Sequence, residues 1–270
     1  MPRIKTRDGT SLYVKDWGEG RSVILTHGWP LGADMWDAQA MALADAGFRV
    51  VFYDRRGFAR SDQPWTGYDY DTFADDLADV MQETGANEDA VIIGFSMGGG
   101  EIARYMSRHG GKGVRAAGLI SSVVPYMLKT PDNPDGTPKE SFDSIAEGIQ
   151  TDRAQFFYET FFPDFFGKKA SKEILAMTTG TALHAGLKPT LAAAKAFGTT
   201  DFRPDLPAFS VPTLIIHGTK DKTVPIDASA RAAHKGIAGS ELIEYEGAPH
   251  GLNVTDGDRL TQDLLAFVQR

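Results

Sequence analysis

The stretch AVIIGFSMGGGE (90–101) sets one serine among glycines directly after an apolar run. A run rich in Val and Ile is typical of a strand buried on both faces, and a helix is expected from Ser96 to about residue 109. Gly94 and Gly98 fit the G-x-S-x-G pattern of a sharp strand-to-helix turn, where a Cβ would collide with neighbouring atoms. The stretch predicts that Ser96 is a nucleophile, at a helix N-terminus that favours developing negative charge. A helix-capping serine among flexible glycines is the alternative.

Strand-like and helix-like segments alternate on either side of this stretch. Helical spacing is expected around 34–46 and 70–84 and near the C-terminal end of the chain. Alternation of this kind predicts an α/β fold with a mostly parallel central sheet flanked by helices. The expected strands are 3–6, 11–17, 22–27, 49–54, 90–95, 114–122, 213–218 and 241–247.

The alternation breaks between residues 124 and 208. This segment begins with the Pro-rich YMLKTPDNPDGTP and continues with the aromatic FFYETFFPDFF (156–166). It predicts a helical cap over 124–208, inserted into a core domain made of 1–123 and 209–270. The aromatic cluster could line an acyl pocket, but packing the cap onto the core is favoured for most of it. No member of the cluster, position 158 included, is assigned to the pocket.

Composition excludes several classes of function. The 270 residues are 42% hydrophobic, enough to bury roughly three quarters of the unfolded surface, and their net charge of -8 argues against a nucleic-acid partner. The absence of cysteine excludes disulfides, zinc–thiolate sites and a Cys nucleophile. No segment resembles a signal peptide or a membrane span. A cytoplasmic location without membrane contact is therefore expected.

A serine nucleophile needs a base and a carboxylate that orients the base. On this kind of sheet the chain order is Ser, then Asp or Glu, then His. Asp221 in HGTKDKTVP and His250 in GAPHGL follow predicted strands on loops, so both should leave the sheet at the same edge as Ser96. His217 is expected to brace the Asp221 loop. The less well placed acids are Asp54, Glu101 and Asp227.

An oxyanion hole needs two N–H donors. Met97, directly after Ser96, should supply one, and Trp29 in HGWPLG (27–32) the other. Pro30 cannot donate, and it restrains Trp29 to an extended conformation. Trp29, Pro30 and Pro125 are expected to border the substrate pocket. The alternative for this loop is an ordinary Gly-Trp-Pro turn with a packed indole.

With these residues assembled, the chain resembles the α/β-hydrolase superfamily, and more narrowly the cofactor-free bacterial haloperoxidases, with the perhydrolase-type aryl esterases and a γ-lactamase branch. Two departures are Ala59, where that family usually has Gly, and Gly99, where many members have Thr. The matching stretches span nearly the whole chain: HGWPL (27–31), YDRRGFARSDQP (53–64), GYDYDTFADDL (67–77), GFSMGGGE (94–101), TDFRPDL (200–206), LIIHGTKDKTVP (214–225) and EGAPHGL (246–252).

The resemblance implies a serine esterase with Ser96, Asp221 and His250 as its triad. It implies an acyl-enzyme that water or hydrogen peroxide attacks, with peracid as the peroxide product, and neither metal nor cofactor. We hypothesise that the Trp29 carbonyl accepts a hydrogen bond from the peroxide. A lactamase or amidase on the same triad and a non-catalytic small-molecule-binding protein are the alternatives. A homo-oligomer is possible by the same resemblance.

Overall fold

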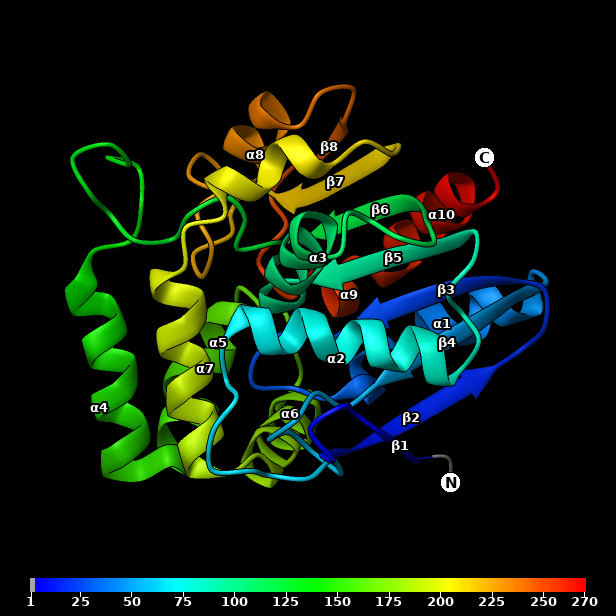
Figure 1. The fold of residues 1–270 in the computed structure, drawn as a ribbon. Coiled ribbons are helices and arrows are strands. Elements are labelled where there is room, and N and C mark those ends of the chain that lie inside the picture. The colour runs from blue at the N-terminus through cyan, green and yellow to red at the C-terminus, as the bar shows by residue number, and fades with distance from the viewer. Residues whose placement is uncertain (1–2) are drawn as a thin grey trace.

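The computed structural model describes residues 3–270 and is built around one eight-stranded sheet (Figure 1). The strand order is β1-β2-β4-β3-β5-β6-β7-β8, in which β1 and β2 are antiparallel to their neighbours and the others are parallel. The mostly parallel sheet predicted from sequence is confirmed. The strands are β1 (Arg3–Lys5), β2 (Ser11–Trp17), β3 (Arg21–Thr26), β4 (Phe48–Tyr53), β5 (Ala90–Phe95), β6 (Val114–Ile120), β7 (Thr213–Gly218) and β8 (Glu241–Tyr245).

Helices cover both faces of the sheet. Figure 1 shows α2 and α3 in front of the strands and α1 and α10 behind them. Short 3-10 segments lie at Ala33–Trp36 and Arg203–Ala208. The flanking helices are α1 (Asp37–Asp45), α2 (Tyr70–Glu83), α3 (Met97–Arg108), α8 (Ala230–Gly236), α9 (Leu252–Thr255) and α10 (Gly257–Val268).

The central strands are buried on both faces, as their unbroken apolar runs predict. Every residue of β5 and β7 is buried. In register, Thr26 at the end of β3 pairs with Gly94 in β5, and Phe95 pairs with Ile120 at the end of β6. The carboxyl ends of these strands therefore lie at one edge, and the loops that follow them start side by side.

A helical segment lies between β6 and β7, beyond the end to which the arrowheads of the parallel strands point (Figure 1). It contains α4 (Lys139–Gln155), a π-helix (Phe156–Phe161), α5 (Phe162–Phe165), α6 (Lys172–His184) and α7 (Leu187–Thr199). Trp29 packs edge-on against Phe157, Phe161 and Phe197 of this segment, with ring centroids 5.2–5.7 Å apart. These helices lie where the cap was expected; the division into a core and a cap stays a prediction.

Two consecutive arginines after β4 carry buried charges. Arg56 makes a bidentate bond to Asp76 on α2, with both N–O distances 2.6 Å. Arg55 pairs with Glu101 on α3 instead. Buried ions are stable only when paired and fully hydrogen-bonded, so these pairs tie the chain after β4 to two different helices.

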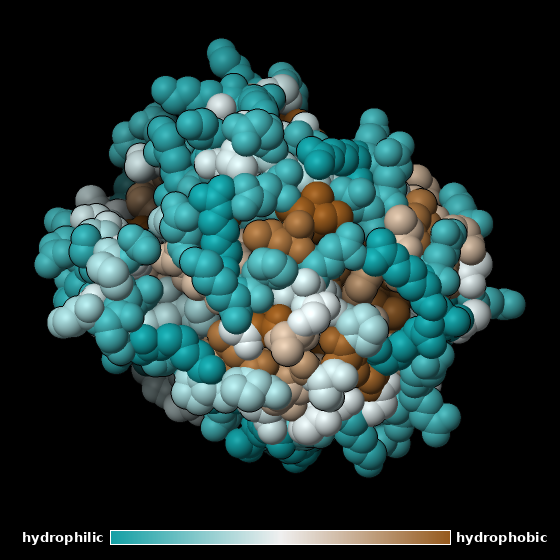
Figure 2. Space-filling view, turned by 90° about the horizontal axis from the view of Figure 1, so that it is seen from above, coloured by the Kyte–Doolittle hydropathy of each residue, from teal (hydrophilic) through white to brown (hydrophobic). Residues whose placement is uncertain are grey.

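Most of the surface in the face that Figure 2 shows is hydrophilic. On this face, hydrophobic patches are small and separated by polar residues. Over residues 3–270, no helix combines the length and the apolar character that crossing a bilayer requires. The exposed large apolar side chains are Met41, Trp65, Tyr158, Met177, Leu187 and Val254.

The backbone at Ala59 predicts a stabilising substitution. Ala59 has φ +44°, in the left-handed region that glycine adopts with less strain. We expect Ala59→Gly to raise the free energy of unfolding by about 1 kcal/mol, measured by urea denaturation. Ala78→Gly, in the interior of α2, is the matched control and should lower the free energy of unfolding by roughly the same amount. A loss of stability in Ala59→Gly would contradict the assignment of strain to this residue.

Candidate active site

Ser96 lies on a strained turn between β5 and α3. Its φ is +53° and its ψ −117°, a backbone conformation that residues other than glycine rarely adopt. The glycines on either side permit this turn: a Cβ at Gly94 would lie 2.4 Å from the Gly98 carbonyl oxygen, and a Cβ at Gly98 would lie 2.5 Å from Thr26 Oγ1. The turn brings the Ser96 hydroxyl to the carboxyl edge of the sheet.

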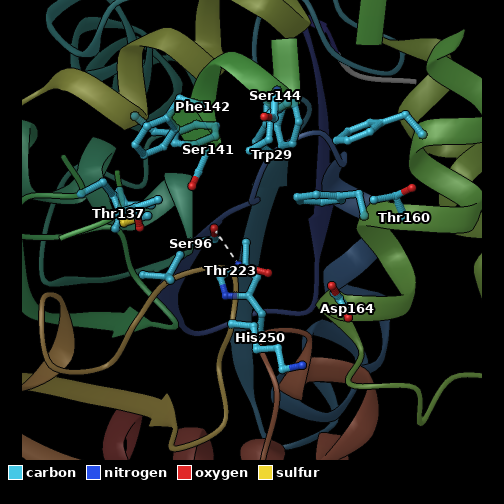
Figure 3. Close-up of a pocket in the computed structure, with 18 residues that line it drawn as sticks. Trp29, Ser96, Thr137, Ser141, Phe142, Ser144, Thr160, Asp164, Thr223 and His250 are labelled. Atoms are coloured by element: carbon cyan, nitrogen blue, oxygen red, sulfur yellow. Dashed lines mark hydrogen bonds between the residues drawn. The ribbon is translucent and has the colours of Figure 1, made fainter. Parts of the chain in front are cut away.

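The structure brings together the three side chains proposed from sequence for catalysis. His250 Nε2 lies 2.9 Å from Ser96 Oγ, and His250 Nδ1 lies 2.6 Å from Asp221 Oδ2. Figure 3 shows the Ser96–His250 hydrogen bond within the cavity. The residues come from three separate loops, after β5, β7 and β8. A serine, an imidazole and a buried carboxylate in this order can pass a proton from the hydroxyl to the ring.

Asp221 is held as a buried carboxylate by donors from its own loop. Its Oδ1 accepts from the backbone N–H groups of Thr223 at 2.9 Å and Val224 at 2.7 Å, while Oδ2 faces His250. Burial acts to raise the pKa of Asp221, but the charge of His250 and the hydrogen bonds from His217 and His250 outweigh it, so the pKa lies well below its usual value. The group is therefore ionised at neutral pH.

His217 lies beside the same carboxylate. Its Nε2 is 2.9 Å from the Val224 carbonyl oxygen and 3.1 Å from Asp221 Oδ2, and the ring is fully buried. Both neighbours are acceptors, so Nε2 carries the proton, and Nδ1 has no partner among the described residues. The ring binds the Asp221–Val224 loop to the end of β7, which is the bracing position expected from sequence.

Two backbone N–H groups near Ser96 have no acceptor in the part of the chain that the structure describes. Within residues 3–270, neither Trp29 N nor Met97 N donates to a protein atom. The Trp29 loop packs closely on Ser96, because a Cβ at Gly28 would lie 3.1 Å from Ser96 Cβ. Unused donors next to a nucleophile can bind the oxygen of a tetrahedral intermediate.

A cavity of about 570 Å³ opens above Ser96 and His250. Trp29 and four phenylalanines line it: Phe142, Phe156, Phe161 and Phe197. Ser141, Ser144 and Thr160 add hydroxyl groups (Figure 3). This volume and an aromatic wall with a few polar groups are typical of small-molecule sites.

The other two residues expected at the pocket border, Pro30 and Pro125, are buried and are not among the residues that line the cavity. Val123 and Met127, which flank Pro125, line it instead. No sequence signal distinguished these positions, because the irregular loop after β6 gives no periodicity from which to read its inward face.

The rival acids are engaged elsewhere. Asp54 accepts from Ala33 N and Arg60 Nε, both at 2.7 Å, and Asp227 pairs with Arg231 at the surface. Glu101 is bound to Arg55. Among the described residues, no group of three His, Asp or Glu side chains is arranged to hold a metal ion.

With this geometry established, comparison with known proteins identifies the family. A family model described as the alpha/beta hydrolase fold matches residues 21–256. The chain belongs to the α/β-hydrolase family. It is 41% identical to the non-heme chloroperoxidase CPO-A1 of Kitasatospora aureofaciens and 39% identical to the bifunctional esterase/perhydrolase DCH of Acinetobacter calcoaceticus, with the whole of each chain covered.

Among solved structures, the bromoperoxidase from Bacillus anthracis is 39% identical and has a TM-score of 0.95, covering 100% of this chain and 99% of that one. The resemblance to haloperoxidases and perhydrolase-type esterases stated from the sequence is thereby confirmed. Gly99 is compatible with this fold, since Ser122 fills the space beside it: a Cβ there would lie 2.0 Å from Ser122 Oγ. Ala59 is accommodated with the positive φ described above.

The position of His217 predicts a role in holding the Asp221 loop. We expect His217→Leu to lower kcat about tenfold or more, with little change in KM, because loss of the Val224 bond lets the carboxylate move. His217→Gln retains an N–H near the Nε2 position and should recover much of the loss. Steady-state kinetics per titrated active site would measure both, with the exposed His234→Leu as control. Equal activities of the Leu and Gln variants would contradict the bracing role.

Proposed function

We propose that the protein hydrolyses carboxylic esters, aryl esters among them, through an acyl-enzyme on Ser96. The observation that carries the proposal is the relay of Ser96, His250 and Asp221, with 2.9 and 2.6 Å between successive side chains, beside two unused N–H donors. Relatives that are named as haloperoxidases and as an esterase/perhydrolase support it.

The first half of the reaction acylates Ser96. His250 Nε2 takes the proton from Ser96 Oγ while the oxygen attacks the ester carbonyl carbon, and Asp221 stabilises the imidazolium that forms. The carbonyl oxygen becomes an alkoxide that accepts from Trp29 N–H and Met97 N–H. Each donor lowers the activation barrier by about 3 kcal/mol. The C–O bond to the alcohol then breaks, and the alcohol leaves with the proton from His250.

The second half releases the acid. Water gives a proton to His250 and adds to the acyl carbon, and the same donors bind the second alkoxide. When the intermediate collapses, Ser96 leaves and recovers its proton from the imidazolium. Hydrogen peroxide in place of water gives a peracid, which can oxidise halide in solution. We propose perhydrolysis as a second activity of this site.

The substrate is proposed to be a small ester. Aromatic side chains line much of the cavity, so an aryl or short acyl group would displace water from an apolar surface. A lactam or amide could acylate the same serine, and relative rates on aryl acetates and bicyclic lactams would separate these substrate classes. The cytoplasmic location and homo-oligomeric assembly remain predictions from sequence.

Replacing the nucleophile tests the proposal directly. Ser96→Ala should lower the hydrolysis of 4-nitrophenyl acetate by a factor of about 10⁴ or more, because the attacking atom is lost. Labelling of the protein by a fluorophosphonate should disappear in the same variant, while the circular dichroism spectrum stays unchanged. If the wild-type protein is neither labelled nor active, a small-molecule-binding role without catalysis is favoured.

The Trp29 carbonyl generates a prediction about peroxide. This oxygen accepts no hydrogen bond from the described residues, and Pro30 restrains its conformation. If it binds the distal proton of hydrogen peroxide, Pro30→Leu should lower the ratio of perhydrolysis to hydrolysis several-fold, measured as peracid and acid released from one ester. An unchanged ratio would remove the carbonyl from the mechanism.

A further inference from the structure

One buried ion pair outside the triad contacts the two segments that carry the Trp29 and Met97 N–H groups. Arg55 and Glu101 are 1% and 0% exposed. Arg55 Nε and one terminal nitrogen lie 2.8 and 2.5 Å from Glu101 Oε2, and Tyr53 donates its hydroxyl to Oε1. Both carboxylate oxygens are therefore satisfied without solvent. Glu101 is on α3, the helix whose first residue is Met97.

The same guanidinium holds the loop that carries Trp29. Arg55 donates from a terminal nitrogen to the His27 carbonyl oxygen at 2.9 Å, and its backbone N–H donates to His27 Nε2 at 2.9 Å. The other terminal nitrogen is 3.9 Å from Met97 Sδ. One side chain thus contacts the Trp29 loop, the Met97 side chain and the helix behind Met97.

His27 transmits this contact to the Trp29 N–H. Because Nε2 accepts from Arg55, the proton of the neutral ring is on Nδ1, which donates to the Gly28 carbonyl oxygen at 2.8 Å. Burial, together with the nearby charge of Arg55, holds the pKa of His27 well below its usual value, so the ring stays neutral. The Gly28 carbonyl and the Trp29 N–H belong to one planar peptide unit. His27 Nδ1 and the Leu31 N–H, which lies 3.0 Å away, both donate to this carbonyl, and fixing it fixes the direction of the Trp29 N–H.

We propose that Arg55 and Glu101 are positioning residues that hold the Trp29 and Met97 N–H groups where both can donate to the same oxyanion. The proposal rests on the ester-hydrolase function above. A buried ion pair is retained at a desolvation cost, and removing one partner leaves the other charge unpaired. Without the carboxylate, Arg55 would shift from His27, and the two donors would lose their common anchor.

The adjacent pair provides a matched control. Arg56 and Asp76 are also buried, 2% and 1% exposed, and are also joined through two guanidinium nitrogens, but they connect the chain to α2. Loss of that pair should destabilise the fold in the same way without moving either oxyanion donor. Glu101→Gln and Asp76→Asn both replace a carboxylate by an amide of the same shape.

The experiment compares these two variants at a temperature where thermal melts show both folded. For Glu101→Gln we expect kcat on 4-nitrophenyl acetate, per titrated active site, to fall about 10- to 100-fold with KM changed less than about 3-fold. Phenylboronic acid, whose adduct with Ser96 imitates the tetrahedral oxyanion, should bind more weakly by a similar factor. Asp76→Asn should keep the wild-type kcat and boronate affinity.

A second pair of variants covers the case in which Glu101→Gln does not fold. The amide nitrogen of Asn lies near the position of His Nδ1, so His27→Asn should retain a donor to the Gly28 carbonyl and most of kcat. His27→Leu should lose kcat and boronate affinity together. The proposal is overturned if Glu101→Gln keeps wild-type kcat, if Asp76→Asn loses as much, or if His27→Asn and His27→Leu behave alike. A wild-type protein that hydrolyses no ester would overturn both this proposal and the proposed function.

Discussion

The turn at Ser96 is the constraint on which the rest of the site depends. Its left-handed backbone stores strain of about 1–3 kcal/mol, and it persists because β5 is fixed between β3 and β6. Gly94 and Gly98 allow the strand, the helix and Thr26 to approach more closely than any Cβ permits. Since the turn cannot relax without disrupting the centre of the sheet, the backbone at Ser96 is fixed, and the other groups can be placed relative to it.

Buried carboxylates are the second feature that fixes the geometry of the site. Asp221 is ionised in a site with no solvent access because backbone N–H groups and His250 donate to it. Glu101 is satisfied by Tyr53 and Arg55 in the same manner. In a low-dielectric interior a charge surrounded by fixed donors is costly to move. These carboxylates therefore act as rigid points from which His250 and, by our proposal, the oxyanion loop are held.

Much of this arrangement could be predicted from the sequence, because it depends on local signals. The apolar runs located the strands, and the glycines around Ser96 identified the turn; chain order then singled out Asp221 and His250. The link between Arg55 and Glu101 had no such signal. The two residues are 46 positions apart in the chain. No sequence pattern indicates which basic residue pairs with an acidic residue on a helix. The cavity wall was equally hidden, since Pro125 and its lining neighbours Val123 and Met127 lie on an irregular loop.

The reacting groups and the cavity wall come from different segments of the chain, and this has a consequence for specificity. Ser96, Asp221, His250 and both proposed oxyanion donors lie outside residues 124–208, whereas much of the cavity wall, including Phe142 and Phe161, lies within that range. The wall contacts Trp29 through aromatic edges, which are weak and adaptable compared with the ion pairs beneath the loop. Substitutions in the wall can therefore reshape the cavity while the buried charges keep the reacting groups in place. If the proposed ester hydrolysis holds, this physical separation of the buried ion pairs from the apolar wall would let one set of reacting groups accept different esters.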